Sequence, residues 1–371
     1  MSLFKFPRTI YFQRDIIDSL GDILEKEGVK NVLIITDKNV QNSIGGRVEK
    51  ALGSIEREFF TGVLPEPSIK QIREAVSSLK SHEYDAIVAI GGGSVIDFSK
   101  AMAVTLSDPQ ADLGSISPFE SLDLKMKIVA VPTTSGTGSD VSFGVVLSDE
   151  EGKLAMGNYE LVPEIDILDP SLTPVDKKII VPTGIDALVH SFEAIASNTS
   201  NVFTDALAER AIETVFNNLE KAEKNDETAK DLMHISATMA GIAFSNSGTA
   251  SAHALGHSFG ATFHVPHGTS VGLFLIPTIA FNSQNPETRE KYLRICRTLN
   301  VRDIESLIRE LKGLFVRVRQ PVHVSELGID KKTYTSKLDQ LVALSMRDSE
   351  LAFNPVLLGD EDLRKIFVEN F

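Results

Sequence analysis

Cysteine is almost absent from the sequence: Cys296 is the only one in 371 residues. An intrachain disulfide is therefore excluded, and a metal site built from thiolates is nearly excluded. Basic residues are also scarce, with 37 Lys and Arg against 51 Asp and Glu and a formal net charge of −14. Because nucleic acids are bound by clustered Lys and Arg, this balance argues against a nucleic-acid partner.

Long apolar segments are missing as well. Residues 1–8 lack the apolar core of a signal peptide, and no apolar run reaches the roughly 18 residues expected of a membrane span. We therefore expect a cytoplasmic enzyme with no membrane partner. The chain is too long for one typical core, so we predict two domains, residues 1–170 and 171–371.

In the first part of the chain, short β-branched apolar runs typical of strands alternate with amphipathic segments of helical spacing. This alternation predicts an α/β domain with a mostly parallel, doubly wound sheet. The pattern of residues 141–156 predicts a β-hairpin. Beyond Asp169-Pro170 the strand patterns largely stop, and helical spacing predicts an all-α domain. The predicted strands are 32–36, 85–90 and 127–131; the predicted helices are 16–27, 68–80, 94–106, 184–196, 205–219, 229–244, 249–259, 287–299, 304–311 and 332–344.

A glycine turn, Gly91-Gly92-Gly93-Ser94, lies between a predicted strand and a predicted helix. Glycines let the backbone approach a pyrophosphate, and a helix N-terminus attracts it. The string is not the G-x-G-x-x-G fingerprint, and a capped helix after a tight turn is the alternative. The stretch from Ser94 to Asp97 also predicts a capping box.

Two other predicted strands end in residues suited to a nucleotide. The loop Pro132–Ser139 is rich in hydroxyls and glycines. Asp37 follows the first strand, where a carboxylate binds ribose hydroxyls and repels a 2′-phosphate, favouring NAD over NADP. Because this acid precedes the glycine turn, it requires a strand order or binding geometry different from that of the usual fingerprint. A solvated aspartate at a turn is the alternative.

Four of the eight histidines lie between positions 253 and 267. Asp186 and His190 are four residues apart, as are His253 and His257, so each pair shares one helix face. The turn expected at Pro266-His267-Gly268 would bring a loop imidazole to these faces. We predict a divalent metal site with nitrogen and oxygen ligands. Imidazole and carboxylate donors suit Fe²⁺ or Zn²⁺, and also Co²⁺ or Ni²⁺, so the sequence leaves the metal open.

The metal ligands that we predict are Asp186, His190, His253 and His267. His257, one turn beyond His253, is interpreted as a proton relay near the metal or as a neighbour of the nicotinamide ring. A purely structural histidine is the alternative for His257.

Together these strings resemble the iron-containing (group III) alcohol dehydrogenase family, over nearly the whole chain. The resemblance implies a nucleotide-binding N-terminal domain, a helical metal-binding C-terminal domain of dehydroquinate synthase-like fold, and a homodimer. It also implies the same four metal ligands and a set of residues near the dinucleotide. These cofactor candidates are Asp37, Gly92, Gly93, Ser94, Asp97, Thr133, Thr134, Thr137 and Lys153.

We therefore expect a metal-dependent oxidoreductase that transfers hydride between a small alcohol, or its aldehyde or ketone, and NAD(H). A proton would leave through His257 or a ribose hydroxyl. A glycerol-dehydrogenase-type zinc enzyme is the nearest alternative. A dehydroquinate-synthase-like lyase fits less well, because that site pairs a Glu with histidines and needs basic residues, whereas Asp186 is the first ligand here. The substrate stays open.

Overall fold

The computed structural model describes residues 3–81, 83–118, 120–148 and 153–371, with the side chains of residues 153 and 154 left out. The chain divides into two compact units, Met1–Pro174 and Val175–Phe371.

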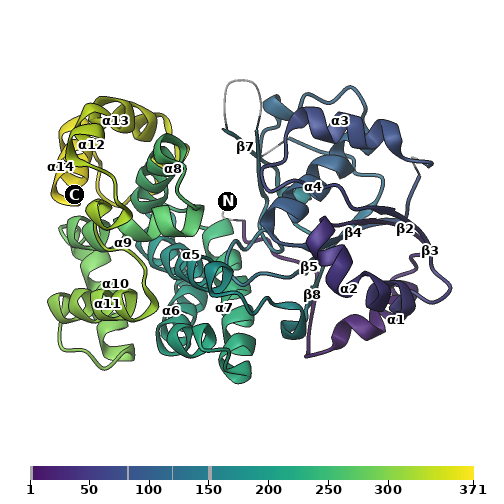
Figure 1. Ribbon diagram of the computed structural model, residues 1–371, viewed down its shortest axis with the longest axis horizontal. Coiled ribbons are helices and arrows are strands. Elements are labelled where there is room, and N and C mark those ends of the chain that lie inside the picture. Colours follow the sequence, from purple (N-terminus) through teal and green to yellow (C-terminus); the bar gives the residue numbers. More distant parts are fainter. Residues whose placement is uncertain (1–2, 82, 119, 149–152) are drawn as a thin grey trace. The chain divides into compact units, whose positions relative to one another are not determined.

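Unit 1 is built on a six-stranded sheet in the order β1-β8-β5-β4-β2-β3, in which every pair is parallel. Helices cover both faces (Figure 1). Its strands are β1 (Thr9–Phe12), β2 (Asn31–Ile35), β3 (Glu56–Phe60), β4 (Ala86–Gly91), β5 (Lys127–Pro132) and β8 (Ile165–Leu168). Its helices are α1 (Leu20–Lys26), α2 (Lys38–Ala51), α3 (Ile69–Ser78) and α4 (Gly93–Ser107), with 3-10 turns η1 (Ile16–Ser19), η2 (Leu113–Ser115), η3 (Tyr159–Leu161) and η4 (Pro170–Leu172).

Apolar runs explain the central strands, because a parallel sheet covered on both faces buries every residue. In β2, Leu33 and Ile35 pack with the α3–α4 layer, whereas Val32 and Ile34 pack with the α1–α2 layer. The chain leaves β2 toward β3 on one side and leaves β4 toward β5 on the other. The carboxyl ends of β2 and β4 therefore form a topological switch point, the usual ligand position in such sheets.

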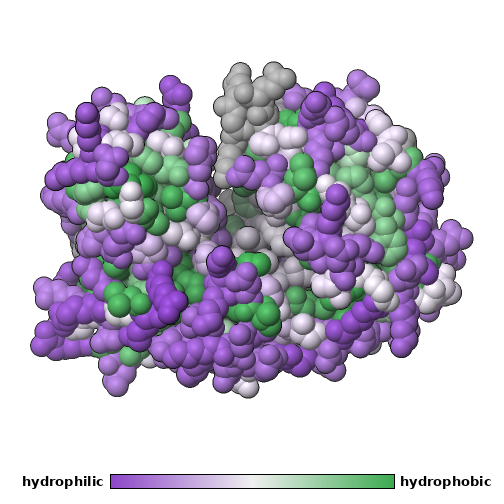
Figure 2. Space-filling view, in the orientation of Figure 1, coloured by the Kyte–Doolittle hydropathy of each residue, from purple (hydrophilic) through white to green (hydrophobic). Residues whose placement is uncertain are grey.

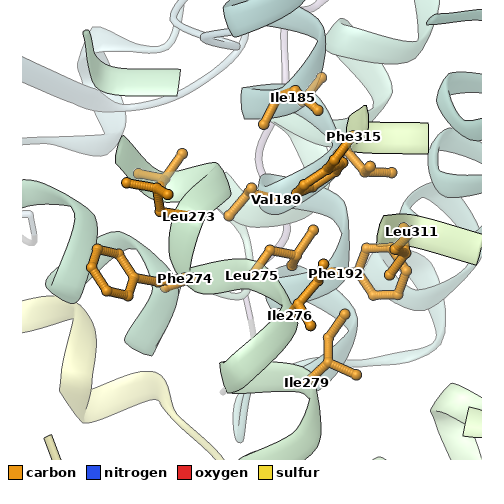
Figure 3. Packing of buried hydrophobic residues seen from close by; sticks show 14 of the residues in the cluster. Ile185, Val189, Phe192, Leu273, Phe274, Leu275, Ile276, Ile279, Leu311 and Phe315 are labelled. Atoms are coloured by element: carbon orange, nitrogen blue, oxygen red, sulfur yellow. The ribbon is translucent and has the colours of Figure 1, made fainter. Parts of the chain in front are cut away.

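Unit 2 is entirely helical, as predicted. A single core joins its central helices: in Figure 3, Phe192 of α5, Ile276 of α9 and Phe315 of α11 lie in one apolar cluster. The helices are α5 (Lys177–Ala196), α6 (Val202–Glu223), α7 (Glu227–Ser245), α8 (Ser251–Phe263), α9 (His267–Asn282), α10 (Pro286–Thr298), α11 (Ile304–Val318), α12 (Lys331–Ser336), α13 (Leu338–Arg347) and α14 (Asp360–Glu369), with 3-10 turns η5 (Val324–Leu327) and η6 (Ser349–Phe353).

Helix α5 is the one helix in the described part of the chain that is long and apolar enough to cross a membrane by length and composition. The length of uninterrupted apolar runs in the sequence did not predict this helix as a candidate span. Of its 18-residue apolar window, 83% is buried inside the protein, as is typical of a core helix. Hydrophilic side chains predominate on the face of each unit drawn in Figure 2, and apolar ones form separate patches.

The strand–helix alternation and the hairpin are confirmed, the latter as β6 (Gly144–Ser148) paired with β7 (Lys153–Gly157). One local prediction is confirmed in part, and another is wrong. The helix expected over residues 16–27 is divided into η1 and α1. The turn expected at Pro266–Gly268 is the start of α9: Pro266 is the N-cap and His267 the first helical residue, since the chain already turns at His264, which has φ 55°.

Candidate metal centre and nucleotide turn

The glycine turn and the hydroxyl-rich loop of unit 1 lie against each other. Strands β4 and β5 pair with Gly91 opposite Pro132, and the Thr133 N–H donates to the Gly91 carbonyl at 3.0 Å. A Cβ on Gly93 would lie 2.9 Å from Thr137, and one on Gly92 would lie 3.4 Å from Thr134. Glycine therefore allows the threonine loop to approach the start of α4.

The capping box predicted from Ser94 to Asp97 is wrong. Gly92 takes the N-cap position and α4 begins at Gly93, so Asp97 lies in the second turn, beyond the free N–H groups. Instead, the buried Asp97 carboxylate accepts the Val146 N–H of β6 at 2.9 Å, and burial raises its pKa. The Ser94 hydroxyl donates to the Pro65 carbonyl.

Asp37 lies at the switch point, because β2 and β4 are neighbours in the sheet. It caps α2: one carboxylate oxygen accepts the N–H groups of Asn39 and Val40 at 2.7 and 3.1 Å. In the sheet order β1-β8-β5-β4-β2-β3, the strand that Asp37 follows thus lies beside the strand that ends in the glycine turn. Lys153 is the first residue of β7, and its side chain lies outside the described part of the chain.

Three helices of unit 2 bring the predicted metal ligands together. Asp186 and His190 lie on α5, His253 on α8 and His267 at the start of α9. The Asp186 Oδ1 atom is 3.3 Å from His267 Nε2, 3.6 Å from His253 Nε2 and 3.9 Å from His190 Nδ1. Ligand atoms of Asp186, His253 and His267 all lie within 4.8 Å of one another, a spacing that suits a metal ion.

Glycines permit this convergence, because α9 contacts both α5 and α8 almost backbone to backbone. A Cβ on Gly268, beside His267, would lie 2.0 Å from the Pro182 carbonyl oxygen of α5. A Cβ on Gly256 of α8 would lie 2.7 Å from the Val271 Cα of α9. Any larger residue would push the ligand-bearing helices apart.

Comparison with known proteins identifies the chain. Residues 7–170 match the family "iron-containing alcohol dehydrogenase", and residues 180–371 match the C-terminal domain of the Fe-containing alcohol dehydrogenase family. The NADPH-dependent butanol dehydrogenase of Clostridium saccharobutylicum is 31% identical, with 99% of this chain and 97% of that protein covered. The chain belongs to the iron-containing alcohol dehydrogenase family.

Solved structures agree with this assignment. The iron-containing alcohol dehydrogenase from Thermococcus thioreducens has a TM-score of 0.91 and 31% identity, covering 100% of this chain and 99% of that one. A sulfoacetaldehyde reductase from Bifidobacterium kashiwanohense, solved in complex with NAD⁺, has a TM-score of 0.89 and 27% identity, covering 100% and 98%.

The family membership confirms the predicted fold and activity. This alcohol dehydrogenase is an oxidoreductase that transfers hydride between a small alcohol, or its aldehyde or ketone, and a nicotinamide cofactor. The comparisons do not favour the lyase alternative or the glycerol-dehydrogenase alternative.

The electrostatics of the dehydrogenase's histidine cluster favour a cation. Burial raises the pKa of Asp186, but the imidazoles of His190 and His267 outweigh this and hold the pKa well below its usual range. Burial lowers the pKa of His253, whereas Glu193 and Asp186 raise it, to about 10 overall. The buried carboxylates beside His253 thus favour positive charge at this site, which a divalent ion would supply.

Two carboxylates that the sequence interpretation missed hold the histidines of α8. Glu193 bonds the Nδ1 atom of His253, and Asp348 Oδ2 lies 2.8 Å from His257 Nδ1. Glu193 lies on the same helix as His190, three residues later, so helical spacing could have revealed it. No local pattern connects Asp348 to His257, because the chain between them forms several further helices.

Proposed function

We propose that Asp186, His190, His253 and His267 hold the divalent metal of this dehydrogenase, iron first and zinc as the alternative. One observation carries the proposal: a buried carboxylate oxygen, Asp186 Oδ1, has three imidazole nitrogens within 3.9 Å and no well-formed hydrogen bond. Burying such an oxygen without a partner is costly, and a cation removes that cost. Three imidazoles and one carboxylate fit Fe²⁺ or Zn²⁺.

The metal, when bound, would supply a Lewis acid for the alcohol oxygen. His257 is proposed as the residue that moves the proton. The Asp348 carboxylate faces its Nδ1 atom and can only accept there, so Nε2 is the nitrogen left to take up a proton. About a third of the His257 side chain, 35%, is exposed, which leaves a route to solvent.

Residues 1–170 are proposed to bind the dinucleotide, and residues 171–371 the metal. The pyrophosphate would lie at the glycine turn, with Gly92, Gly93 and Ser94 at the N-terminus of α4. The nearby threonine loop offers Thr133, Thr134 and Thr137 as further donors. Asp97, buried beneath β6, is better placed to support the turn than to touch the cofactor.

NAD is the cofactor that we propose, because Asp37 presents a carboxylate at the switch point where a 2′-phosphate would have to lie. The relatives do not share one preference: one is NADPH-dependent, and another was solved with NAD⁺. A homodimer and a cytoplasmic location remain predictions of the sequence.

The test is NADH formation from a panel of small primary and secondary alcohols, run with NAD and NADP on enzyme loaded separately with Fe²⁺ and Zn²⁺. Asp186→Ala should bind no metal and should lose at least about a thousandfold in kcat/KM, equivalent to about 4 kcal/mol of transition-state stabilisation. Full activity in an Asp186→Ala protein that holds no metal would overturn the proposal.

A further inference from the structure

Glu193 is a buried carboxylate that contacts the candidate metal site without belonging to it. It lies on α5 with only 4% of its side chain exposed. Its Oε2 atom bonds His253 Nδ1, while Oε1 accepts the backbone N–H groups of Ala252 and His253 at 2.5 and 3.3 Å. One side chain therefore makes three contacts with the first turn of α8.

Helix α8 has no capping side chain of its own. It begins at Ser251 after Ala250, whose methyl group cannot accept a hydrogen bond. The first N–H groups of a helix need acceptors, and an oxygen at this position stabilises the helix. Glu193 supplies that acceptor from α5, so the helix that carries His253 is tied to the helix that carries Asp186 and His190.

The contact with His253 also selects which ring nitrogen faces the site. An ionised carboxylate only accepts hydrogen bonds, so Nδ1 must carry the proton. The other nitrogen, Nε2, lies 3.6 Å from Asp186 Oδ1, on the side where the ligand atoms converge. Metals bind the nitrogen that carries no proton, and the partner of the other nitrogen fixes this choice.

We propose that Glu193 is a positioning residue for the metal. It holds His253 in the tautomer whose Nε2 is free to bind the metal, and it keeps the start of α8 beside Asp186 and His190 of α5. This inference rests on the proposed metal site. A merely structural reading, in which Glu193 only caps α8, is the competing explanation.

Glutamine and alanine at position 193 separate the two explanations. Glutamine keeps a carbonyl oxygen for the N–H groups of α8, but its amide can only donate to His253 Nδ1. The imidazole proton would then move to Nε2, the atom that must bind the metal. Alanine removes the acceptor of the Ala252 and His253 N–H groups and leaves the tautomer unconstrained, while Asn354 Oδ1 still accepts the Ser251 N–H at 3.3 Å. The positioning role therefore predicts that the two variants rank oppositely in stability and in metal affinity. Glu193→Gln should be the more stable apoprotein, whereas Glu193→Ala should bind metal more tightly.

The experiment uses the full-length apoprotein and the variants Glu193→Gln, Glu193→Ala and, as a matched control, Glu350→Gln. Glu350 accepts the Thr249 hydroxyl near the start of α8 and touches no imidazole in the described contacts. Affinity for Zn²⁺ and Co²⁺ is measured by competition with a chelator, and apoprotein stability by thermal unfolding. We expect Glu193→Gln to lower the apoprotein Tm less than Glu193→Ala does, and to lose about 10–100-fold in metal affinity.

Glu193→Ala should unfold at a lower temperature yet bind metal better than Glu193→Gln, and Glu350→Gln should bind as the wild type does. Equal metal affinity in Glu193→Gln and wild type would overturn the positioning role. If Glu193→Gln does not fold, Glu193→Ala decides, because affinity equal to that of Glu350→Gln would overturn it as well. Wild-type protein that binds neither ion would refute the metal site itself, a separate outcome.

Discussion

Gly268 is the position at which a single methyl group should disturb the metal site most. The Cβ of an alanine there would lie 2.0 Å from the Pro182 carbonyl oxygen and 2.6 Å from its carbonyl carbon. Contacts below 3.0 Å are not tolerated, so the backbones of α5 and α9 must separate by about 1 Å. No side-chain rotation can relieve the clash, because both contacting atoms belong to the backbone.

Two effects should follow from Gly268→Ala. Overpacking a core usually costs about 1–3 kcal/mol, and a clash with backbone belongs at the upper end of that range. His267 precedes Gly268 and would move with it relative to Asp186. Since metal–ligand distances tolerate only about 0.2 Å, a shift of this size would break the contact, and metal affinity should fall at least about tenfold.

Gly313→Ala is the matched control. This glycine lies inside α11, and its Cβ would meet only the flexible end of Arg317 at 3.2 Å. Replacing a glycine in a helix interior by alanine should stabilise unit 2 by about 0.5–1 kcal/mol. Urea unfolding and chelator competition on both variants decide the case. A Gly268→Ala protein that matches Gly313→Ala in stability and metal affinity would refute the argument from helix contact.

Two further changes test unit 1. Asp37→Asn keeps an oxygen for the N–H groups of Asn39 and Val40 but removes the charge. We therefore expect unchanged stability and a roughly tenfold shift of the KM ratio toward NADP, measured by steady-state kinetics. An unaltered KM ratio would contradict the proposed role of Asp37. Asp166 is fully buried in β8 without a well-formed hydrogen bond, and burial together with Asp140 raises its pKa well above the usual range. The folded state therefore binds more protons than the unfolded state, so the free energy of unfolding should fall as pH rises above the ordinary carboxyl pKa. Asp166→Asn should flatten this pH dependence and raise the Tm near pH 7. An unchanged slope would disprove the raised pKa of Asp166.

Sequence patterns predicted the α/β and all-α parts of the fold, the loops at the strand ends and the residue pairs on α5 and α8, because helical spacing and strand-end chemistry are local properties. They failed where a distant contact decides. His267 was expected in a loop, but the left-handed His264 places the turn earlier and lets α9 start at His267. The second carboxylate on α5, Glu193, accepts N–H groups at the start of α8, which has no capping side chain of its own. Helical spacing places Glu193 near His190 on α5, but its contact with the start of α8 depends on a partner helix and cannot be read from spacing.

The candidate ligands are separated widely along the chain, from Asp186 on α5 to His267 on α9. An ion held by both would act as a cross-link that closes a long loop, much as a disulfide does in chains that have more than one cysteine. Removing the ion should therefore make the helical unit easier for a protease to digest while leaving the sheet unit as resistant as before. Because Cys296 is the only cysteine of the sequence, an intrachain disulfide cannot form, and the metal ion would provide the cross-link instead.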